Sequence, residues 1–240
     1  MAKVSQNISS DSLFHFVRRR EWLLRILKES SFKARYVYEE LPEIGYYAGI
    51  PMKCFCDIPL GVIKKHIGKY GRYGIGIKKE FARIHGFSPV FYVHENSDTM
   101  KRYIKGAKKN SLHSKDSLLP YFKLDEIYSK GKDGRKLTNR LYDEREWRWI
   151  PANPEFEDFK GFSEEQIRET RLDFVNLNLD KEKSKYRLPF HFSDISYIFV
   201  QFEDDVDKII EELRRSKIDS RSADRLIAKI ITSRQIERDF

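Results

Sequence analysis

The chain has 240 residues and a formal net charge of +9, from 46 Lys and Arg against 37 Asp and Glu. Hydrophobic residues make up 40% of the chain and aromatic residues 14%, which excludes a fully disordered protein. Two cysteines are too few for a disulfide-stabilised secreted module, and no apolar run approaches the roughly 20 residues of a membrane-spanning helix, so we expect a cytoplasmic protein with no membrane partner.

The N-terminal part is expected to alternate short strands and helices. Residues 1–10 are polar and serine-rich, so we expect them to be disordered and a single domain to fill residues 11–240. Residues 12–17 are typical of a strand, and residues 18–28 have apolar side chains at helical spacing. Residues 52–58 alternate in the manner of a further strand.

Residues 73–78 predict a strand with an unusual face. Tyr73, Ile75 and Ile77 point one way, whereas Gly74 and Gly76 occupy the opposite face. Because glycine has no side chain, this face allows another chain or a ligand to approach the backbone closely.

The remaining elements follow without an internal repeat or a clear linker. Further strands are expected at residues 89–93, 145–150, 186–192 and 195–200. Helices are expected at residues 62–70, 97–109, 117–128, 206–213 and 226–231, with a capping box at 163–166 and a polar loop at 129–139. Short strands that do not alternate regularly with crossover helices favour an α+β architecture.

Most familiar chemical signatures are missing from the sequence. It has no phosphate-binding loop of the Walker type, no dinucleotide-binding glycine fingerprint and no His-Glu-x-x-His motif. Cys54, Cys56 and His66 could supply three metal ligands, but two cysteines at positions i and i+2 of a strand are more often buried small hydrophobic residues. We therefore expect no metal site.

Three clusters remain as candidates for chemistry. His15 lies among aromatic residues, which is usual for a packed histidine at the core or its rim. Tyr70 and Tyr73 accompany the glycines. Glu146 and Arg148 share one face of a strand, where they form either an ordinary ion pair or a site in which Glu146 orients a ligand hydroxyl while Arg148 keeps it ionised or binds phosphate.

Two sequence blocks are specific when taken together. They are Cys-Phe-Cys-Asp-Ile-Pro-Leu at 54–60 and Tyr-Asp-Glu-Arg-Glu-Trp-Arg at 142–148. With Ser-Leu-Phe-His-Phe at 12–16 and Tyr-Gly-Arg-Tyr-Gly-Ile-Gly at 70–76, they resemble the AbiGi family from residue 12 to about residue 240. Members are named for bacterial abortive infection, and are usually labelled antitoxins. The resemblance implies a role in phage defence and a cognate toxin or antitoxin as partner.

A more distant resemblance implies a mechanism. The order of a His strand, a Tyr strand with glycines and a late Glu strand resembles ADP-ribosyltransferase folds, including DNA-modifying toxins. That likeness implies a split, mostly antiparallel sheet flanked by helices, with NAD as cofactor. His15 would hold the ribose and amide region, and Tyr73, with Tyr70 as second choice, would stack on nicotinamide. Glu146 would bind the ribose hydroxyl and stabilise an oxocarbenium-like transition state, and Arg148 would contribute to cofactor binding.

Two classes of function follow. The first is an ADP-ribosyltransferase-like effector that uses NAD to modify nucleic acid or protein, with His15, Tyr73 and Glu146 converging on one cleft. Residues 1–150 carry 30 basic and 17 acidic side chains, a surplus that would guide a polyanion. The alternative is a non-catalytic antitoxin or regulator that binds a partner toxin or nucleic acid.

Overall fold

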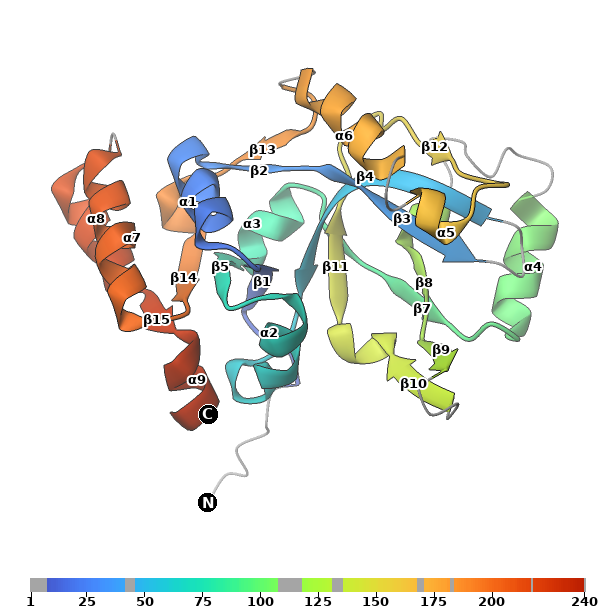
Figure 1. Cartoon of the computed structure of the whole chain (residues 1–240), viewed down its shortest axis with the longest axis horizontal. Coiled ribbons are helices and arrows are strands. Elements are labelled where there is room, and N and C mark those ends of the chain that lie inside the picture. The colour runs from blue at the N-terminus through green and yellow to red at the C-terminus, as the bar shows by residue number, and fades with distance from the viewer. Residues whose placement is uncertain are drawn as a thin grey trace. The chain divides into compact units, whose positions relative to one another are not determined.

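A computed structural model of the chain describes residues 8–41, 46–107, 118–130, 136–167, 171–181, 184–216 and 218–239 (Figure 1). The chain forms two compact units, each assembled from segments that are distant in sequence. The first unit comprises Met1–Phe32, Cys54–Gly86 and Leu188–Phe240, and the second comprises Lys33–Lys53 and Phe87–Arg187. The expected single domain over residues 11–240 stays a prediction.

The first unit contains most of the helices. Its strands are β1 (Ser12–Val17), the end of β4 (Tyr46–Cys56), β5 (Tyr73–Lys78), β14 (Ile195–Val200) and β15 (Ile230–Thr232), and β2 (Ser31–Lys33) and β13 (Arg187–Pro189) lie at its boundaries. Its helices are α1 (Arg20–Glu29), α2 (Lys64–Tyr70), α3 (Lys79–Ile84), α7 (Glu203–Arg215), α8 (Ser220–Ile227) and α9 (Ser233–Asp239), with short 3₁₀ helices η2 (Leu60–Val62) and η6 (Phe192–Asp194).

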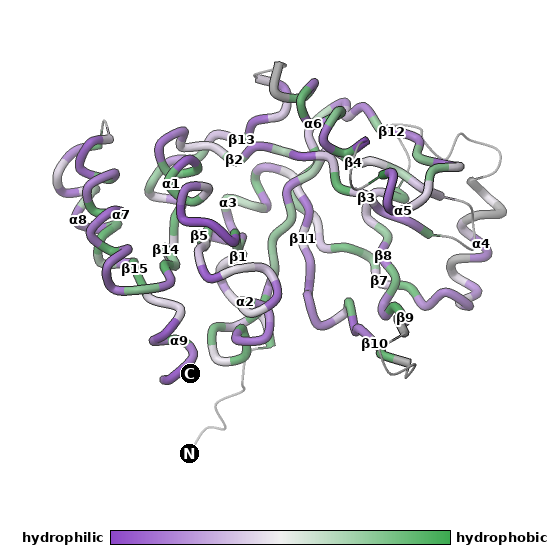
Figure 2. The backbone as a smooth tube through the Cα atoms, viewed as in Figure 1, coloured by the Kyte–Doolittle hydropathy of each residue, from purple (hydrophilic) through white to green (hydrophobic). Residues whose placement is uncertain are grey.

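The strands of the first unit follow the order β15-β14-β5-β1 and continue to the end of β4. All of these pairings are antiparallel except that of β14 with β15. Helices α7 and α8 lie side by side next to β14 (Figure 1). Both alternate between hydrophilic and hydrophobic residues (Figure 2), and Ile209 and Leu213 of α7 are buried, which is typical of an amphipathic helix.

The glycine face of β5 is used for packing within the sheet. Gly74 pairs with Phe16 and Gly76 pairs with Phe14 of β1. A Cβ atom at Gly74 would lie 2.7 Å from the Phe16 ring and 2.8 Å from the carbonyl oxygen of His15. The groups that approach this face are therefore the phenyl rings of Phe14 and Phe16 on β1, and the approach of another chain or a ligand stays a prediction.

The second unit is built around the long strand β4. Its strands are β3 (Arg35–Leu41), most of β4, β6 (Ser88–Pro89), β7 (Phe91–Val93), β8 (Phe122–Leu124), β9 (Glu126–Lys130), β10 (Lys136–Arg140), β11 (Glu146–Trp149) and β12 (Glu157–Asp158). Its helices are α4 (Asp98–Ala107), α5 (Glu164–Gln166) and α6 (Leu172–Lys181), with 3₁₀ helices η3 (Leu119–Tyr121) and η4 (Leu141–Glu144). Strands β3 and β12 pair antiparallel with β4, β11 with β6, and β9 with β10, whereas β7 and β8 are parallel. The expected α+β class with mostly antiparallel pairing is confirmed, and the ADP-ribosyltransferase-like arrangement stays a prediction.

Several predicted elements were wrong. The helix expected at residues 117–128 is replaced by η3, β8 and the start of β9, because Pro120 opens a short 3₁₀ turn and the following residues pair with β7. The helix expected at 226–231 ends at Ile227, and β15 follows because it pairs with β14. Of the loop expected at 129–139, residues 131–135 lie outside the described residues, and β10 occupies the end.

The last residues of the segment 1–10, which was predicted to be disordered, make contacts within the first unit. Residues 1–7 lie outside the described residues, whereas the Ser9 hydroxyl donates to the carboxylate of Asp57 at 2.9 Å and the Ser10 backbone N–H donates to it at 2.8 Å. Lys79 adds an ion pair to Asp57 at 2.9 Å. Within the described segments, no helix has the length and apolar character needed to cross a bilayer.

Candidate functional site

The second unit contains a group of five ionisable side chains, which we call the charge cluster: Glu39, Lys123, Glu144, Glu146 and Arg148. Glu144, Glu146 and Arg148 are buried, whereas Glu39 and Lys123 are half-buried. Successive side chains of a strand point to opposite faces, so β11 places Glu146 and Arg148 on the same side, and both are buried. The Arg148 Nε donates to Glu146 Oε1 at 2.8 Å. The predicted shared face and ion pair are thus confirmed.

Arg148 is the centre of the charge cluster. Its side chain is 0% exposed. Besides Glu146, it donates to Glu39 Oε1 at 2.8 Å and to the carbonyl oxygen of Pro120 at 2.5 Å. These partners come from β3, η3 and β11, so one guanidinium joins three segments that are distant in sequence.

Lys123 supplies the second cation of the charge cluster. Strand β8 holds it so that its Nζ lies 2.5 Å from Glu146 Oε2 and 2.8 Å from Glu144 Oε2. Three carboxyl groups therefore share two cations. Such groups tolerate burial only because each charge has a close opposite partner.

The surroundings of Glu146 and Glu39 shift the pKa values of these two carboxyl groups in opposite directions. Burial disfavours the charge of Glu146, but Arg148 and Lys123 outweigh that effect and hold its pKa below the ordinary range. Burial dominates at Glu39 and raises its pKa, against the opposing influence of Arg148 and Lys123. Glu146 is therefore held ionised, and Glu39 is the carboxyl that takes up a proton more readily.

Tyr73 belongs to a network in the first unit. Its hydroxyl donates to Asp205 Oδ2 at 2.9 Å, and Asp205 Oδ1 accepts from the Arg20 guanidinium at 2.8 Å. Burial, together with the bond to Asp205, raises the pKa of Tyr73 to about 12. The tyrosine thus fastens β5 to the start of α7, with a buried ring and an engaged hydroxyl.

His15 lies on the same side of β1 and β5 as Tyr73. Val17 is the partner of Tyr73 across the two strands, and His15 is two positions further along the same face. The His15 Nδ1 is 2.9 Å from the carbonyl oxygen of Cys54. Because a carbonyl oxygen only accepts, this nitrogen is the donor. The ring packs beside Phe55, with centroids 5.5 Å apart.

Tyr70 lies on the other side of the sheet. It packs against the core cluster that contains Phe16, and its ring is 4.4 Å from the ring of His66. The structure therefore brings Tyr73, rather than Tyr70, to the face of His15. Glu146 and Arg148 belong to the second unit, and the convergence of His15, Tyr73 and Glu146 on one cleft stays a prediction.

The predicted metal-ligand candidates have packing roles. Cys54 is half-buried, and Cys56 is buried in the same core cluster as Phe16. In the parts of the chain that the structure describes, no group of three or more His, Cys, Asp or Glu side chains is arranged to hold a metal ion.

Sequence reasoning missed several members of these networks. Glu144 lies inside the block at 142–148, so the sequence placed it near Glu146. Lys123 was not predicted, because residues 117–128 were expected to form a helix. Glu39 is 109 positions from its partner Arg148, and Asp205 is 132 positions from Tyr73. No local pattern reports pairs at such separations.

Comparisons with known proteins place the chain in a family. A sequence model described as "Putative abortive phage resistance protein AbiGi, antitoxin" matches residues 21–201. A relative from Lactococcus lactis subsp. cremoris, the "Abortive phage resistance protein AbiGi", is 30% identical over 222 residues, an alignment that covers 80% of this chain and 89% of that protein. No solved structure matches the chain. The family match spans most of the chain and confirms the resemblance of the sequence blocks: the chain belongs to the AbiGi family.

Proposed function

We propose that this chain acts in the bacterial cytoplasm during phage infection, as an antitoxin that holds a partner toxin by non-covalent binding. One structural observation carries the proposal: Glu146 and Tyr73, two of the residues predicted to be catalytic, are engaged by partners within the chain. Glu146 has both carboxylate oxygens bonded, to Arg148 and to Lys123, and Tyr73 has its hydroxyl bonded to Asp205. The family description, which names an antitoxin, supports the same reading.

The internal contacts of Glu146 and Tyr73 favour a function in which the protein binds a partner through its outer surface. A buried ion pair of this kind holds segments in register, whereas a catalytic carboxylate must contact the reacting atoms of a substrate. Glu146 is only 6% exposed. Binding of a partner would instead use the outer surfaces of the units.

NAD-dependent ADP-ribosyl transfer is the second proposal. One observation favours it, because Glu146 is held as an ionised carboxylate beside Arg148, as a stabiliser of an oxocarbenium-like charge would be. The burial of Glu146 and the engagement of its two oxygens do not fit a contact with a ribose hydroxyl. Tyr73, with its buried ring, likewise does not fit stacking on nicotinamide.

The two proposals are separated by a charge-balanced double variant. Glu146→Gln alone leaves Lys123 with one carboxylate fewer in a buried site, so a loss of function could reflect unfolding. Glu146→Gln combined with Lys123→Gln removes one anion and one cation, and thermal unfolding identifies whether the fold is retained. The chain is then co-expressed with the product of the adjacent gene, and growth, phage protection and co-elution of the two proteins are measured.

An antitoxin predicts that the folded double variant still neutralises growth arrest and co-elutes with its partner. An ADP-ribosyltransferase predicts that the same variant loses phage protection and that the unaltered chain consumes labelled NAD. Loss of neutralisation by a stably folded double variant, together with NAD consumption, would replace the first proposal with the second.

A further inference from the structure

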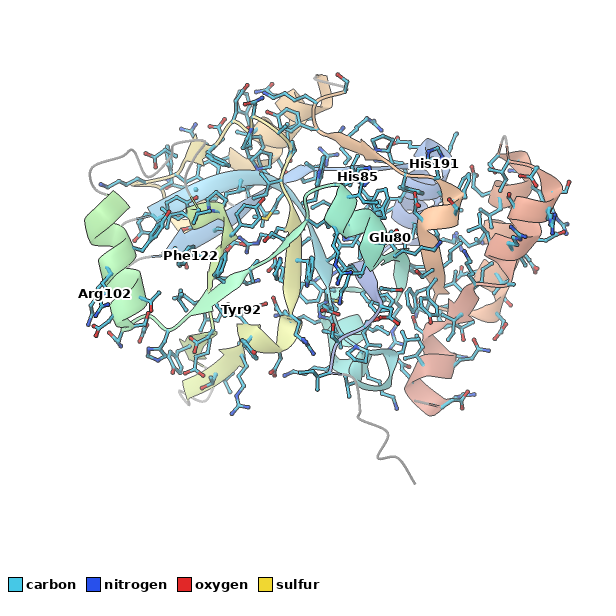
Figure 3. All side chains as sticks on the ribbon, turned by 180° about the vertical axis from the view of Figure 1, so that it is seen from behind. Glu80, His85, Tyr92, Arg102, Phe122 and His191 are labelled. Carbon is cyan, nitrogen blue, oxygen red and sulfur yellow. The ribbon has the colours of Figure 1, made fainter. Side chains whose placement is uncertain are left out.

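A surface cavity of about 450 Å³ lies in the first unit, and neither Tyr73 nor its partners Asp205 and Arg20 line it. Two segments line it: the end of β5 with α3, and the turn from β13 into η6. The lining side chains are Lys78, Glu80, Phe81, Ile84, His85, Pro189, Phe190, His191 and Asp194. Figure 3 shows Glu80, His85 and His191 around this part of the molecule. The volume is within the range of small-molecule sites.

One wall of the cavity is a prepared aromatic surface. The rings of Phe81 and His85 are in contact, with centroids 4.1 Å apart and planes tilted by 30°. The His85 Nδ1 donates to the carbonyl oxygen of Phe81 at 2.9 Å, which fixes the orientation of the imidazole and leaves Nε2 as the acceptor of the neutral ring. Ile84 extends this wall with a side chain that is 74% exposed. Together these groups offer a flat, largely apolar face to a planar ligand.

Acceptors and cations lie at the other edges of the cavity. Glu80 and Asp194 contribute carboxylates, and Asp194 is oriented because its Oδ2 accepts from the His191 backbone N–H at 2.8 Å. Lys78 lines the cavity. Lys229, whose Nζ lies 2.6 Å from the carbonyl oxygen of Ile195, is close enough to Lys78 for their charges to interact. Burial lowers the pKa of Lys229, and so do the neighbouring charges of Lys78 and Arg225. Among the described residues that line the cavity, Lys78 is the one Lys or Arg side chain, and it stands with two carboxylates.

We propose that this cavity binds a nucleotide, with the base against His85 and Ile84 and the phosphate at Lys78. A nucleotide combines the three features that the lining offers: a planar ring, N–H donors for carboxylates, and a phosphate for a lysine. The carboxylates of Glu80 and Asp194 can only accept hydrogen bonds when ionised, so they favour bases whose exocyclic amino group offers two N–H donors over uracil, which offers one at N3. Adenine, guanine and cytosine nucleotides therefore bind more tightly than UMP. This site is independent of the proposed antitoxin role.

Isothermal titration calorimetry of the full chain tests the assignment, with AMP, GMP, CMP, UMP and inorganic phosphate as separate probes up to about 1 mM, near the weak limit of specific binding. We expect saturable binding of at least one amino-bearing nucleotide and none of phosphate alone. Lys78→Glu and His85→Ala each weaken this binding by about tenfold or more, as expected for the loss of one charged or stacking contact. Lys64→Glu is the matched control, because Lys64 is exposed in α2 and does not line the cavity, and it leaves the affinity within about twofold.

A second probe distinguishes the source of the nucleotide. Tighter binding of a 5′-phosphorylated dinucleotide than of the mononucleotide assigns the site to the end of a nucleic acid, and equal or weaker binding assigns it to a free nucleotide. The proposal is overturned if no mononucleotide binds, if phosphate alone binds as tightly, or if Lys78→Glu and His85→Ala bind as the unaltered chain does. Thermal unfolding of each variant confirms that these exposed substitutions leave the fold intact.

Discussion

Replacing Arg148 by Met should strongly destabilise the second unit. The substitution keeps a long side chain but removes a guanidinium that is 0% exposed and that bonds Glu39, Glu146 and the Pro120 carbonyl. Three carboxyl groups, two of them buried, would then share only Lys123. Removing one partner of a buried ion pair costs about 3–5 kcal/mol, because the remaining charge is left uncompensated. For a chain of this size, about 2–4 °C of melting temperature is lost per kcal/mol, which gives a shift of about 6–20 °C.

The measurement needs a probe that reports on the second unit. The chain has 3 tryptophans, and Trp147 and Trp149 lie in β11 beside Arg148. Trp22 lies in α1 of the first unit and is 43% exposed, so Trp22→Phe removes the unrelated signal at small cost. Urea unfolding followed by fluorescence in this background then gives the change in free energy.

The pH dependence and a double variant complete the test. The pKa of Glu146 is lower in the folded chain, so its stabilising contribution is present above its unfolded pKa of about 4.3 and is lost as the pH falls. The cost of Arg148→Met is therefore largest near neutral pH and shrinks below about pH 5. Glu39→Gln combined with Arg148→Met should cost less than Arg148→Met alone. A loss below about 1 kcal/mol for the single variant at pH 7 would refute the view that the guanidinium compensates buried charge.

Three further predictions concern the first unit. Gly74→Ala places a Cβ atom 2.7 Å from the Phe16 ring and should lower the free energy of unfolding by about 1–3 kcal/mol. At Gly68 in α2 an added Cβ atom meets no neighbouring side chain of the described residues within 4 Å, so Gly68→Ala should raise the free energy of unfolding by about 0.5–1 kcal/mol. Equal effects of the two variants in urea unfolding would contradict the packing argument. Burial opposes the charge of Asp205, but bonds from Arg20 and Tyr73 hold its pKa below the ordinary value, so its contribution is present above its unfolded pKa of about 3.9 and fades as the pH falls. Asp205→Asn should therefore flatten the fall in melting temperature between about pH 5 and pH 3, and an unchanged slope would count against this role. Lys79→Met removes the ion pair with Asp57 and should cost about 3 kcal/mol, with part of the loss recovered by adding Asp57→Asn; additive effects in thermal unfolding would show that the pair is not coupled.

The sequence predicted local features well and long-range partners poorly. Alternation identified β1, β5 and β11 and the shared face of Glu146 and Arg148, because strand periodicity is a property of neighbouring residues. Lys123 was not predicted as a site residue, because the apolar residues around Pro120 also fit helical spacing. Only the pairing of β8 with β7 decides between a helix and a strand at this position. Glu39 and Asp205 escaped for a related reason, since their partners are more than a hundred positions away and are set by the fold.

The division of the chain into units has a consequence for synthesis. The chain crosses between the units after Phe32, Lys53, Gly86 and Arg187. Residues leave the ribosome from the N-terminus at about 5–20 per second, so every segment of the second unit has been made once Arg187 has emerged. The first unit must wait for residues 188–240, because β14 supplies the partner strand of β5. A nascent chain therefore carries β1 and β5 with an open sheet edge until the last part of translation, and a chain that stops early lacks the strand that closes this edge.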